Sequence, residues 1–430
     1  MSANQPDFQK AQVGVIVILA AVYILQIATP LRLSTDTVVL LSSAESAARG
    51  GGLLYQGHPT QYPPGYPTLI AALMRLGIAH VWLIVGISVG SILLGLAAAR
   101  FFLLQEFFSD DSSLITICIV SLLSFVTIKY TVIPLTDPLF FGVAMCSLAV
   151  MSSAASQFTW RKLALSVALI LISISIRKIG VTLIPALLWI VVARPEVRRI
   201  TNHLSFRAKV AIGAVAAFAA SIVVWLFFTA SMMRRFALID NASAALGGRT
   251  LADSVLTILA FHFRELGEIS INLPFPALRP TMQDLLPFVG AAAFLLVLGG
   301  LFSRRRRLGV VDIFFMSYSA VILVWPFYDP RFWLPVLPFL VAYVGLSIQY
   351  CVQKGISTHV FEVWAFGFAI MGLPVLASST ILSFSNSSFG DKYYVDRYHA
   401  TYCAAGYCAR GSDSTDAVDP DALRLLQAFK

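Results

Sequence analysis

The sequence has little charge. Only 12% of its 430 residues are Asp, Glu, Lys or Arg, whereas a soluble domain carries about a quarter. This deficit excludes an ordinary soluble domain, because such a domain needs a charged surface. What is present instead is apolar: 58% of the residues are hydrophobic and the mean hydropathy is +0.80. This balance is typical of a polytopic membrane protein.

Cysteine and histidine are also scarce, with five and six copies. No cysteine spacing indicates a zinc site. Cys118, Cys146 and Cys351 lie in or beside apolar runs, where cysteine is a packing residue. Cys403 and Cys408 lie in the polar C-terminal region. If that region is outside the cytoplasm, we expect a disulfide between them that closes a small loop.

The net charge of +9 does not indicate a nucleic-acid partner. Four of the positive charges are consecutive, Arg304 to Arg307, and lie between two apolar runs, where membrane topology explains them. No cleavable signal peptide is expected, because the run from Ala11 to Ala28 is long enough to span and lacks a small-residue cleavage site. The surroundings we expect are membrane lipids.

The apolar runs predict an all-α integral membrane protein with about 11 transmembrane helices, in a range of about 10 to 13. A long first outer loop with short juxtamembrane helices follows the first span. The predicted spans are 11–29, 81–99, 114–135, 138–155, 163–176, 179–193, 209–230, 285–302, 308–327, 332–350 and 360–382.

The distribution of Lys and Arg predicts the orientation. If the N-terminus is cytoplasmic, the loops on the cytoplasmic side are short and dense in Lys and Arg, as the positive-inside rule requires. We therefore expect a multi-pass membrane protein with its C-terminus outside the cytoplasm. The predicted division is a transmembrane domain at 1–382, with outer loops 30–80 and 231–284, and a short polar outer tail at 383–430.

The second outer loop contains an expected interfacial helix from Thr250 to Ile271. Either it only packs on the bundle or it guides a substrate. His58 and His262 are expected to be polar loop residues rather than catalysts. The apolar stripe has helical spacing, with Arg264, Glu265 and Glu268 outside it; it consists of Leu251, Val255, Ile258, Leu259, Phe263 and Leu266.

Charged groups at or near membrane depth are costly, so each is a candidate for function. On the predicted outer face, cations could hold an anion while a carboxylate acts as a base or binds a metal. Such a set suits a substrate with an anionic head and an apolar tail, such as a polyprenyl phosphate. The candidates are Asp36, Asp137, Lys129, Arg177, Lys178, Asp329 and Arg331.

Each candidate also has a structural interpretation. Asp36 could be a helix cap in a solvated loop, and Asp137 could cap the helix that Pro138 begins. The adjacent cations Arg177 and Lys178 could be snorkelling interfacial residues. The last cation, Arg331, could pair with its neighbour Asp329 and only fix a turn.

Five short motifs in family order carry a resemblance. Together they resemble the polytopic glycosyltransferases of the GT-C type, in particular the bacterial relatives of dolichyl-phosphate-mannose protein mannosyltransferases. The motifs are Asp36 after the first span, Tyr62-Pro63-Pro64-Gly65-Tyr66-Pro67, Thr136-Asp137-Pro138-Leu139, Arg177-Lys178-Ile179-Gly180 followed by Pro185, and Asp329-Pro330-Arg331-Phe332-Trp333-Leu334-Pro335 with Pro338.

The resemblance implies an inverting transfer from a sugar on a polyprenyl phosphate, at the outer face of a bacterial plasma (inner) membrane. Asp36 would be the general base or would orient the acceptor. Arg331, with Lys178 or Arg177, would neutralise the departing phosphate. Asp137 would orient the acceptor or order the first loop. The remaining residues shape that loop, with a short helix starting at Tyr66; they are Tyr62, Pro63, Pro64 and Tyr66.

The chain departs from the family at two points. Thr37, Val38 and Val39 follow Asp36, where many relatives have a second acid and an aromatic residue. Tyr62 precedes the Pro-Pro pair, where aminoarabinose-type transferases carry Lys, which argues against that subclass. No cofactor is therefore certain, and a divalent metal stays open. Unlike in oligosaccharyltransferases, no large C-terminal outer domain is expected.

Two rival functions stay open. A transporter or flippase for a lipid-linked sugar would use the same cations without needing a base. Transporters often show inverted repeats, and the sequence shows no such symmetry. A non-catalytic membrane assembly subunit would not need the outer acids. The sequence does not tell the sugar or the acceptor, which could be a lipid, a glycan or a protein.

Overall fold

The computed structural model describes residues 5–108, 111–192, 251–352, 359–393, 398–409 and 417–429. These residues are mostly helical. The one sheet among them is a hairpin of two-residue strands, β1 (Leu54–Tyr55) and β2 (His58–Pro59), paired antiparallel. The all-α membrane class is therefore confirmed for the described part of the chain.

Six described helices are long and apolar enough to cross a membrane, and a bent pair brings the number to seven. The predicted number of about 11 therefore stays a prediction. One reason is that two apolar runs form short helices, α9 (Leu183–Val192) and α16 (Val310–Leu323); another is that the run 209–230 lies outside the described residues. The six are Gln9–Ala28, Val81–Glu106, Thr136–Ser156, Pro280–Ser303, Pro330–Cys351 and Val363–Ser383.

The helices follow the predicted runs closely. From the N-terminus they are α1 (Gln5–Leu25), η1 (Gln26–Ala28), α4 (Val81–Glu106), α5 (Asp111–Leu123), α6 (Phe125–Thr131), α7 (Thr136–Ser156), α8 (Trp160–Ile176) and η2 (Lys178–Thr182). After α13 (Leu251–Ile271) come η3 (Phe275–Ala277), α14 (Pro280–Gln283), α15 (Leu286–Ser303), η4 (Pro330–Val336), α17 (Leu337–Val352) and α18 (His359–Ser383).

The bent pair, α5 and α6, turns by 57° at Ser124. Asn272 fills the break with its side-chain amide, which accepts from Phe125 N at 2.7 Å and donates to Leu123 O and Phe368 O, both at 2.9 Å. Backbone groups freed inside an apolar environment need such partners. The break is thus a built feature of the fold.

Small residues let the helices of the bundle approach closely. A side chain at Gly142 of α7 would meet Ser91 O of α4 at 2.7 Å. Gly267 of α13 and Gly290 of α15 likewise face each other's helix backbone with no room for a Cβ. Close backbone approach through glycine is a common packing device between membrane helices.

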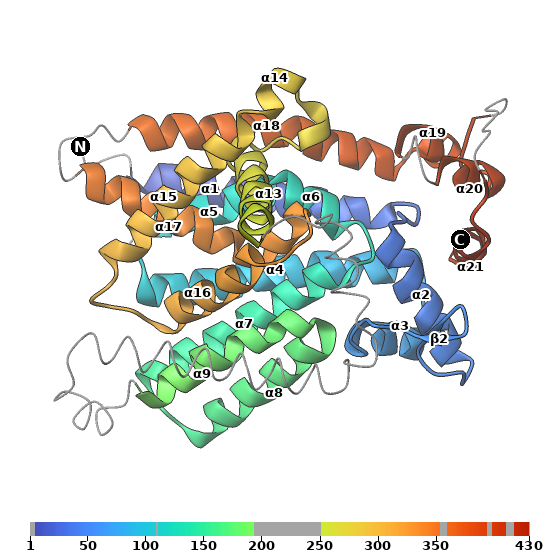
Figure 1. Cartoon of the computed structure of the whole chain (residues 1–430), viewed down its shortest axis with the longest axis horizontal. Helices are drawn as coiled ribbons and strands as arrows, with labels where there is room; N and C mark the ends of the chain where they lie inside the picture. Colours follow the sequence, from blue (N-terminus) through green and yellow to red (C-terminus); the bar gives the residue numbers. More distant parts are fainter. Residues whose placement is uncertain are drawn as a thin grey trace.

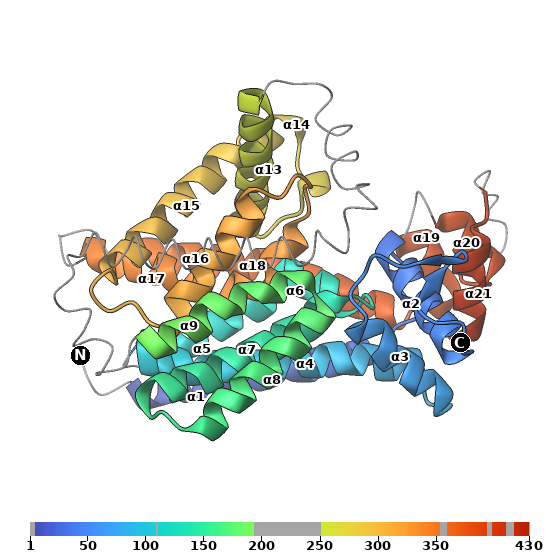
Figure 2. The ribbon, with the colours of Figure 1, turned by 60° about the horizontal axis from the view of Figure 1, so that its bottom comes forward.

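One end of the bundle carries a cap of short elements (Figures 1 and 2). The loop 30–80, which the sequence predicts to be the first outer loop, supplies α2 (Thr35–Ala48), the hairpin and α3 (Gly65–Arg75). The C-terminal region supplies η5 (Asn386–Ser388), α19 (Phe389–Tyr393), α20 (His399–Ala404) and α21 (Pro420–Ala428). The N-terminus lies at the opposite end (Figure 1).

The C-terminal region is folded onto the first outer loop. Arg424 Nε lies 3.0 Å from Glu45 Oε2, and Gln56 Nε2 donates to Asp421 at 3.0 Å. Tyr402 of α20 donates to Leu31 O at 3.0 Å, and its hydroxyl accepts from Leu33 N at 2.8 Å. Residues at the two ends of the sequence thus form one cap.

The expected helix at Thr250–Ile271 is present as α13, but the face it buries differs from the expected stripe. Glu265 and Glu268 are buried, whereas Val255 is 47% exposed. The physical reason is hydrogen bonding: Glu268 accepts from Phe275 N at 2.8 Å, and Glu265 accepts from the segment before α17. Donors from neighbouring elements make a buried carboxylate tolerable.

Candidate active site

Asp36 lies in the first turn of α2, at the end of the bundle that carries the cap. The N-cap of this helix is Ser34, whose Oγ accepts from Thr37 N at 3.2 Å. A carboxylate in the first turn is favoured by the helix dipole. Because Ser34 is the N-cap residue of α2, the interpretation of Asp36 as a helix cap is wrong. The Asp36 carboxylate can therefore bind other partners.

Two donors hold the Asp36 carboxylate. The Tyr62 hydroxyl donates to Oδ1, and Arg331 Nη2 donates to Oδ2. Burial disfavours the charged carboxylate, but the Arg331 charge and the two hydrogen bonds outweigh it and hold the pKa of Asp36 below its usual value. The pKa of Tyr62 is raised, first by burial and then by the Asp36 charge. Asp36 is therefore ionised and Tyr62 is protonated at neutral pH.

Tyr62 has more contact with this site than its sequence indicates. From the sequence we expect it only to shape the loop before the Pro-Pro pair. In the structure its hydroxyl reaches Asp36 across 26 positions of the chain. The available signal was a hydroxyl-bearing residue at the position where aminoarabinose-type relatives carry a cation.

Arg331 reaches Asp36 from the start of η4. Asp329 caps this short helix by accepting from Arg331 N at 3.1 Å. The Arg331 Nε lies 2.7 Å from Asp329 Oδ2, an ion pair whose angle is not that of a hydrogen bond. The expected pairing of Arg331 with Asp329 is thus present, and the guanidinium contacts Asp36 as well.

A second ion pair lies beside the first. Asp137, buried in the first turn of α7, accepts from Arg177 Nη1 at the end of α8. The guanidinium carbons of Arg177 and Arg331 lie 5.3 and 5.4 Å from the centre of the Phe332 ring, within the range of a cation–π contact. One aromatic ring therefore joins the two ion pairs.

Helix α13 fixes the segment that carries Arg331. Glu265 Oε1 accepts from Asp329 N at 2.5 Å, and Oε2 accepts from Trp333 Nε1 at 2.8 Å. His262 Nδ1 lies 2.8 Å from the same Oε2, and its Nε2 lies 2.7 Å from Trp325 O. Both side chains are fully buried. The sequence did not predict this pair, because the apolar stripe of α13 placed Glu265 on the polar face.

The other predicted residues lie around this site. Lys178 begins η2, but the ion pair to Asp137 uses its neighbour Arg177. Lys129 lies 5.1 Å from the Tyr130 ring, and Tyr130 donates to Asp329 at 3.3 Å. Helix α3 begins at Gly65, one residue before the expected start at Tyr66, and Pro64 is its N-cap. The Tyr66 side chain is buried. Pro63, half-buried, joins Tyr62 to this helix.

The acids of the site do not fit a shared divalent cation. Both oxygens of Asp36 accept from donors, and Asp137 is paired with a guanidinium. Within the described residues, one cluster of His, Cys, Asp and Glu has metal-ligand proximity, and it lies in the C-terminal cap: Asp391, His399, Cys403 and Cys408. In this structure Asp36 and Asp137 are thus partners of cations of the chain itself.

Solved structures similar to this chain include ArnT from Cupriavidus metallidurans bound to undecaprenyl phosphate, at 15% identity and a TM-score of 0.48, covering 94% of this chain and 69% of that one. The apo state of the same ArnT is 16% identical with a TM-score of 0.46, covering 92% of this chain and 67% of that one. A third is the archaeal oligosaccharyltransferase AglB from Archaeoglobus fulgidus, in complex with an inhibitory peptide and a dolichol-phosphate. It is 12% identical with a TM-score of 0.45, covering 95% of this chain and 61% of that one.

These neighbours are glycosyltransferases of the GT-C fold, the group that the sequence motifs resemble. The chain spans about two thirds of the length of ArnT and less of AglB. No protein-family model and no curated protein matches the chain. Identity and TM-score are both low, so the activity of this protein is inferred from its own side chains.

Proposed function

We propose that this protein is an inverting membrane glycosyltransferase. It moves a hexosyl or pentosyl group from a polyprenyl-phosphate donor to a lipid, glycan or protein acceptor at the outer face of the membrane. One observation carries this proposal: an ionised carboxylate, Asp36, is paired with Arg331 and hydrogen-bonded by Tyr62 at the capped end of a membrane bundle. A base and an anion-binding cation stand side by side.

The Asp36–Arg331 pair is an exchangeable contact in this proposal. A donor phosphate offers Arg331 a more highly charged partner with more acceptor oxygens. When Arg331 turns to the phosphate, Asp36 loses its main stabilising charge while its burial stays. The pKa of Asp36 then rises, and the carboxylate becomes a better base at the moment when the donor is bound.

The transfer step follows from this arrangement. An acceptor hydroxyl attacks the anomeric carbon, and its proton passes to Asp36. The bond between the anomeric carbon and the phosphate oxygen breaks, and that oxygen leaves with the bonding electrons on the polyprenyl phosphate. Arg331 stabilises the developing negative charge. Attack opposite the leaving group inverts the anomeric configuration.

Arg177 and Asp137 are the second half of the site. Phe332 holds the Arg177 guanidinium next to that of Arg331, so Arg177 adds positive charge near the phosphate. Asp137 is buried and fixes Arg177; it orients this cation and, through it, the first loop. Lys178 is the neighbouring cation that could take over part of the phosphate contact.

Replacing Asp36 by Asn tests the proposal. The protein is reconstituted in vesicles with a sugar-labelled polyprenyl-phosphate hexose or pentose and a membrane extract as acceptor. We expect the rate of polyprenyl phosphate release to fall by about 10²- to 10⁴-fold, the range for loss of a general base. The matched control is Glu45→Gln, which removes a carboxylate from the same helix and should keep the wild-type rate. Full activity of Asp36→Asn would remove Asp36 from the mechanism.

Transport of a lipid-linked sugar is the second candidate, and the break between α5 and α6 favours it, since transporters use broken helices. The same vesicles separate the two functions. Movement of intact labelled lipid between leaflets, without release of polyprenyl phosphate in wild type or Asp36→Asn, would replace the transferase proposal by transport.

A further inference from the structure

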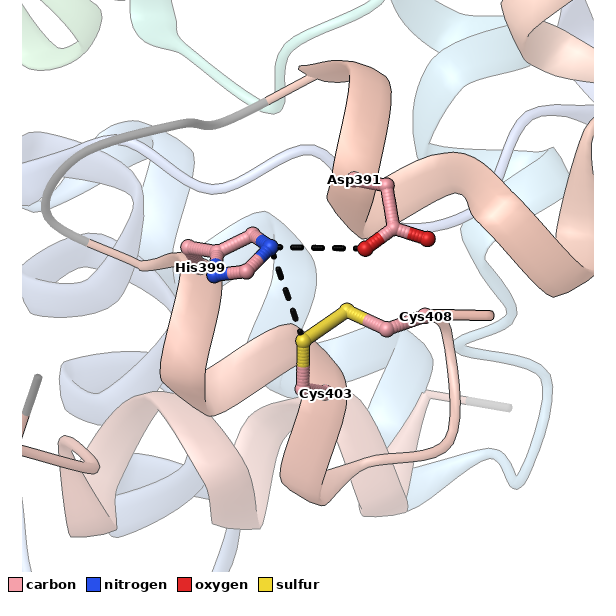
Figure 3. Close-up of side chains that lie close together, drawn as sticks. All are labelled: Asp391, His399, Cys403 and Cys408. Carbon is pink, nitrogen blue, oxygen red and sulfur yellow. Dashed lines mark hydrogen bonds and ion pairs between the residues drawn. A yellow bond between two sulfur atoms is a disulfide. The ribbon is translucent and has the colours of Figure 1, made fainter. Parts of the chain in front are cut away.

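The C-terminal cap contains a cluster of metal-ligand side chains that the proposed transferase does not use. Asp391 of α19, His399 and Cys403 of α20, and Cys408 just after α20 converge on one point (Figure 3). Their ligand atoms all lie within 4.8 Å of one another. His399 Nε2 lies 3.4 Å from Asp391 Oδ1 and 3.7 Å from Cys403 Sγ.

These separations match the edges of a tetrahedral zinc site. With Zn–S about 2.3 Å and Zn–N or Zn–O about 2.0–2.2 Å, tetrahedral angles give edges of about 3.4 Å between N and O and about 3.6 Å between N and S. Four residues separate Cys403 from Cys408. This spacing occurs in zinc sites, although by itself it did not indicate one in the sequence. The two edges that meet at His399 therefore already have the lengths of a tetrahedral site, and the ligand atoms of Asp391 and Cys403 lie within 4.8 Å of each other.

The fourth corner depends on the redox state. In the structure Cys403 and Cys408 form a disulfide with an S–S distance of 2.06 Å. Zinc is bound by the thiolate and not by a disulfide sulfur. The two sulfur atoms would separate to about 3.8 Å in a tetrahedral site, so the disulfide and the metal exclude each other.

We propose that the reduced C-terminal cap binds one Zn²⁺ through Asp391, His399, Cys403 and Cys408, and that the oxidised cap replaces the metal by the disulfide. The reaction that connects the two states balances with a dithiol as reductant. The protein disulfide takes two electrons and two protons and gives two thiols, while the dithiol becomes a disulfide. Zn²⁺ then displaces the two thiol protons and binds the two thiolates.

The surroundings support the cluster as a built site. Asp391 Oδ2 accepts from Ala409 N at 2.7 Å, which leaves Oδ1 directed at His399. Gly390 N donates to Tyr407 O at 2.9 Å and joins α19 to the end of the cysteine loop. Backbone donors of this kind orient a carboxylate ligand. A metal bound by the cluster would therefore join α19 to α20, whereas the disulfide closes the loop that follows α20.

The helix that carries His399 and Cys403 also contacts the start of the first outer loop. Between His399 and Cys403, α20 carries Tyr402, whose hydroxyl contacts the backbone of Leu31 and Leu33. This loop leads directly into α2 and Asp36. A metal in the reduced chain would thus keep the same packing that the disulfide keeps in the oxidised chain.

Titration with Co²⁺, as a spectroscopic substitute for Zn²⁺, tests the proposal in the purified full chain. The background is Cys118→Ser, Cys146→Ser and Cys351→Ser, so that only the cap thiols remain. After reduction with a phosphine we expect one equivalent of Co²⁺ with thiolate charge-transfer and tetrahedral absorption bands, displaced by Zn²⁺. The oxidised protein should give no such bands.

Two variants separate the site from metal binding by any pair of thiols. His399→Ala and Asp391→Asn should each weaken Co²⁺ binding by more than about tenfold, as expected for loss of a ligand, while still forming the disulfide in oxidant. An unfolding temperature equal to that of the parent shows that each variant is folded. The proposal fails if reduced protein gives no thiolate bands, or if both variants bind Co²⁺ as tightly as their parent. Neither outcome depends on glycosyl transfer.

Discussion

At the scale of single residues, Asp36 keeps its charge because two donors oppose the effect of burial. Arg331 contributes most, and Tyr62 contributes a hydrogen bond. Only the ionised carboxylate can accept a proton, so activity should be lost as the pH falls through the pKa of Asp36. A lowered pKa also means that the folded state gains stability from Asp36 above its ordinary pKa and loses it as the pH falls further.

Replacing Tyr62 by Phe should change this titration. The hydrogen bond from Tyr62 lowers the pKa of Asp36, so its loss raises that pKa and moves the acidic limb of the pH–rate profile to higher pH. We also expect kcat to fall about tenfold, because the carboxylate loses a donor that fixes its orientation toward the acceptor.

The measurement is the rate of polyprenyl phosphate release between acid and neutral pH. Tyr55→Phe, in the hairpin of the same loop, is the control that should leave the profile in place. An unchanged acidic limb in Tyr62→Phe would mean that Tyr62 only shapes the loop, as the sequence by itself indicates.

At the scale of elements, α13 acts as a support for η4. Two of its buried polar residues, His262 and Glu265, bind backbone groups and the Trp333 side chain of the segment from Trp325 to Trp333. Arg331 lies within that segment, so the position of the proposed phosphate ligand is set by a helix that is far from it in sequence. α13 therefore does more than pack on the bundle.

Replacing Glu265 by Gln should loosen this support. Gln has one acceptor oxygen where Glu265 accepts through two, so a buried donor loses its partner at a cost of about 1–3 kcal/mol. We expect a lower thermal unfolding temperature in detergent and a KM for the polyprenyl-phosphate donor raised about tenfold.

The exposed acid on the same helix, Asp253, provides the control variant Asp253→Asn, which should leave both values unchanged. A Glu265→Gln protein with lower stability but an unaltered KM would show that the network stabilises the fold without positioning Arg331.

At the scale of the whole molecule, the two ends of the chain lie at opposite ends of the bundle (Figure 1). The cap that contains Asp36 also contains the C-terminal helices. If the N-terminus is cytoplasmic, as the Lys and Arg distribution indicates, the cap and the proposed active site face the outside.

Labelling with a membrane-impermeant maleimide checks this orientation. Lys10→Cys and Val418→Cys, both at exposed positions, are introduced separately in a chain that lacks the three free cysteines and keeps its disulfide. In bacterial spheroplasts we expect labelling of Val418→Cys at once and of Lys10→Cys only after permeabilisation. The reverse order would place the cap and Asp36 in the cytoplasm.

The sequence by itself determined the class of the protein and the positions of most of its helices. Long apolar runs decide this without tertiary information, because a helix is what satisfies backbone groups in lipid. It also indicated four candidate site residues, Asp36, Asp137, Arg177 and Arg331, because a charge next to an apolar run is costly and is therefore a candidate for function. The number of spans was less determined, since a run such as 308–327 yields the shorter helix α16.

Only the tertiary structure decided which charges meet. Arg331 pairs with Asp36 across 295 positions, and Arg177 with Asp137 across 40; no local pattern encodes such pairings. The same holds for the Tyr62 hydroxyl, the buried Glu265 and the packing of the C-terminal cap on the first outer loop. Helical periodicity reports which face of a helix is apolar, but the donors that make a buried carboxylate stable come from other elements, and only folding brings them together.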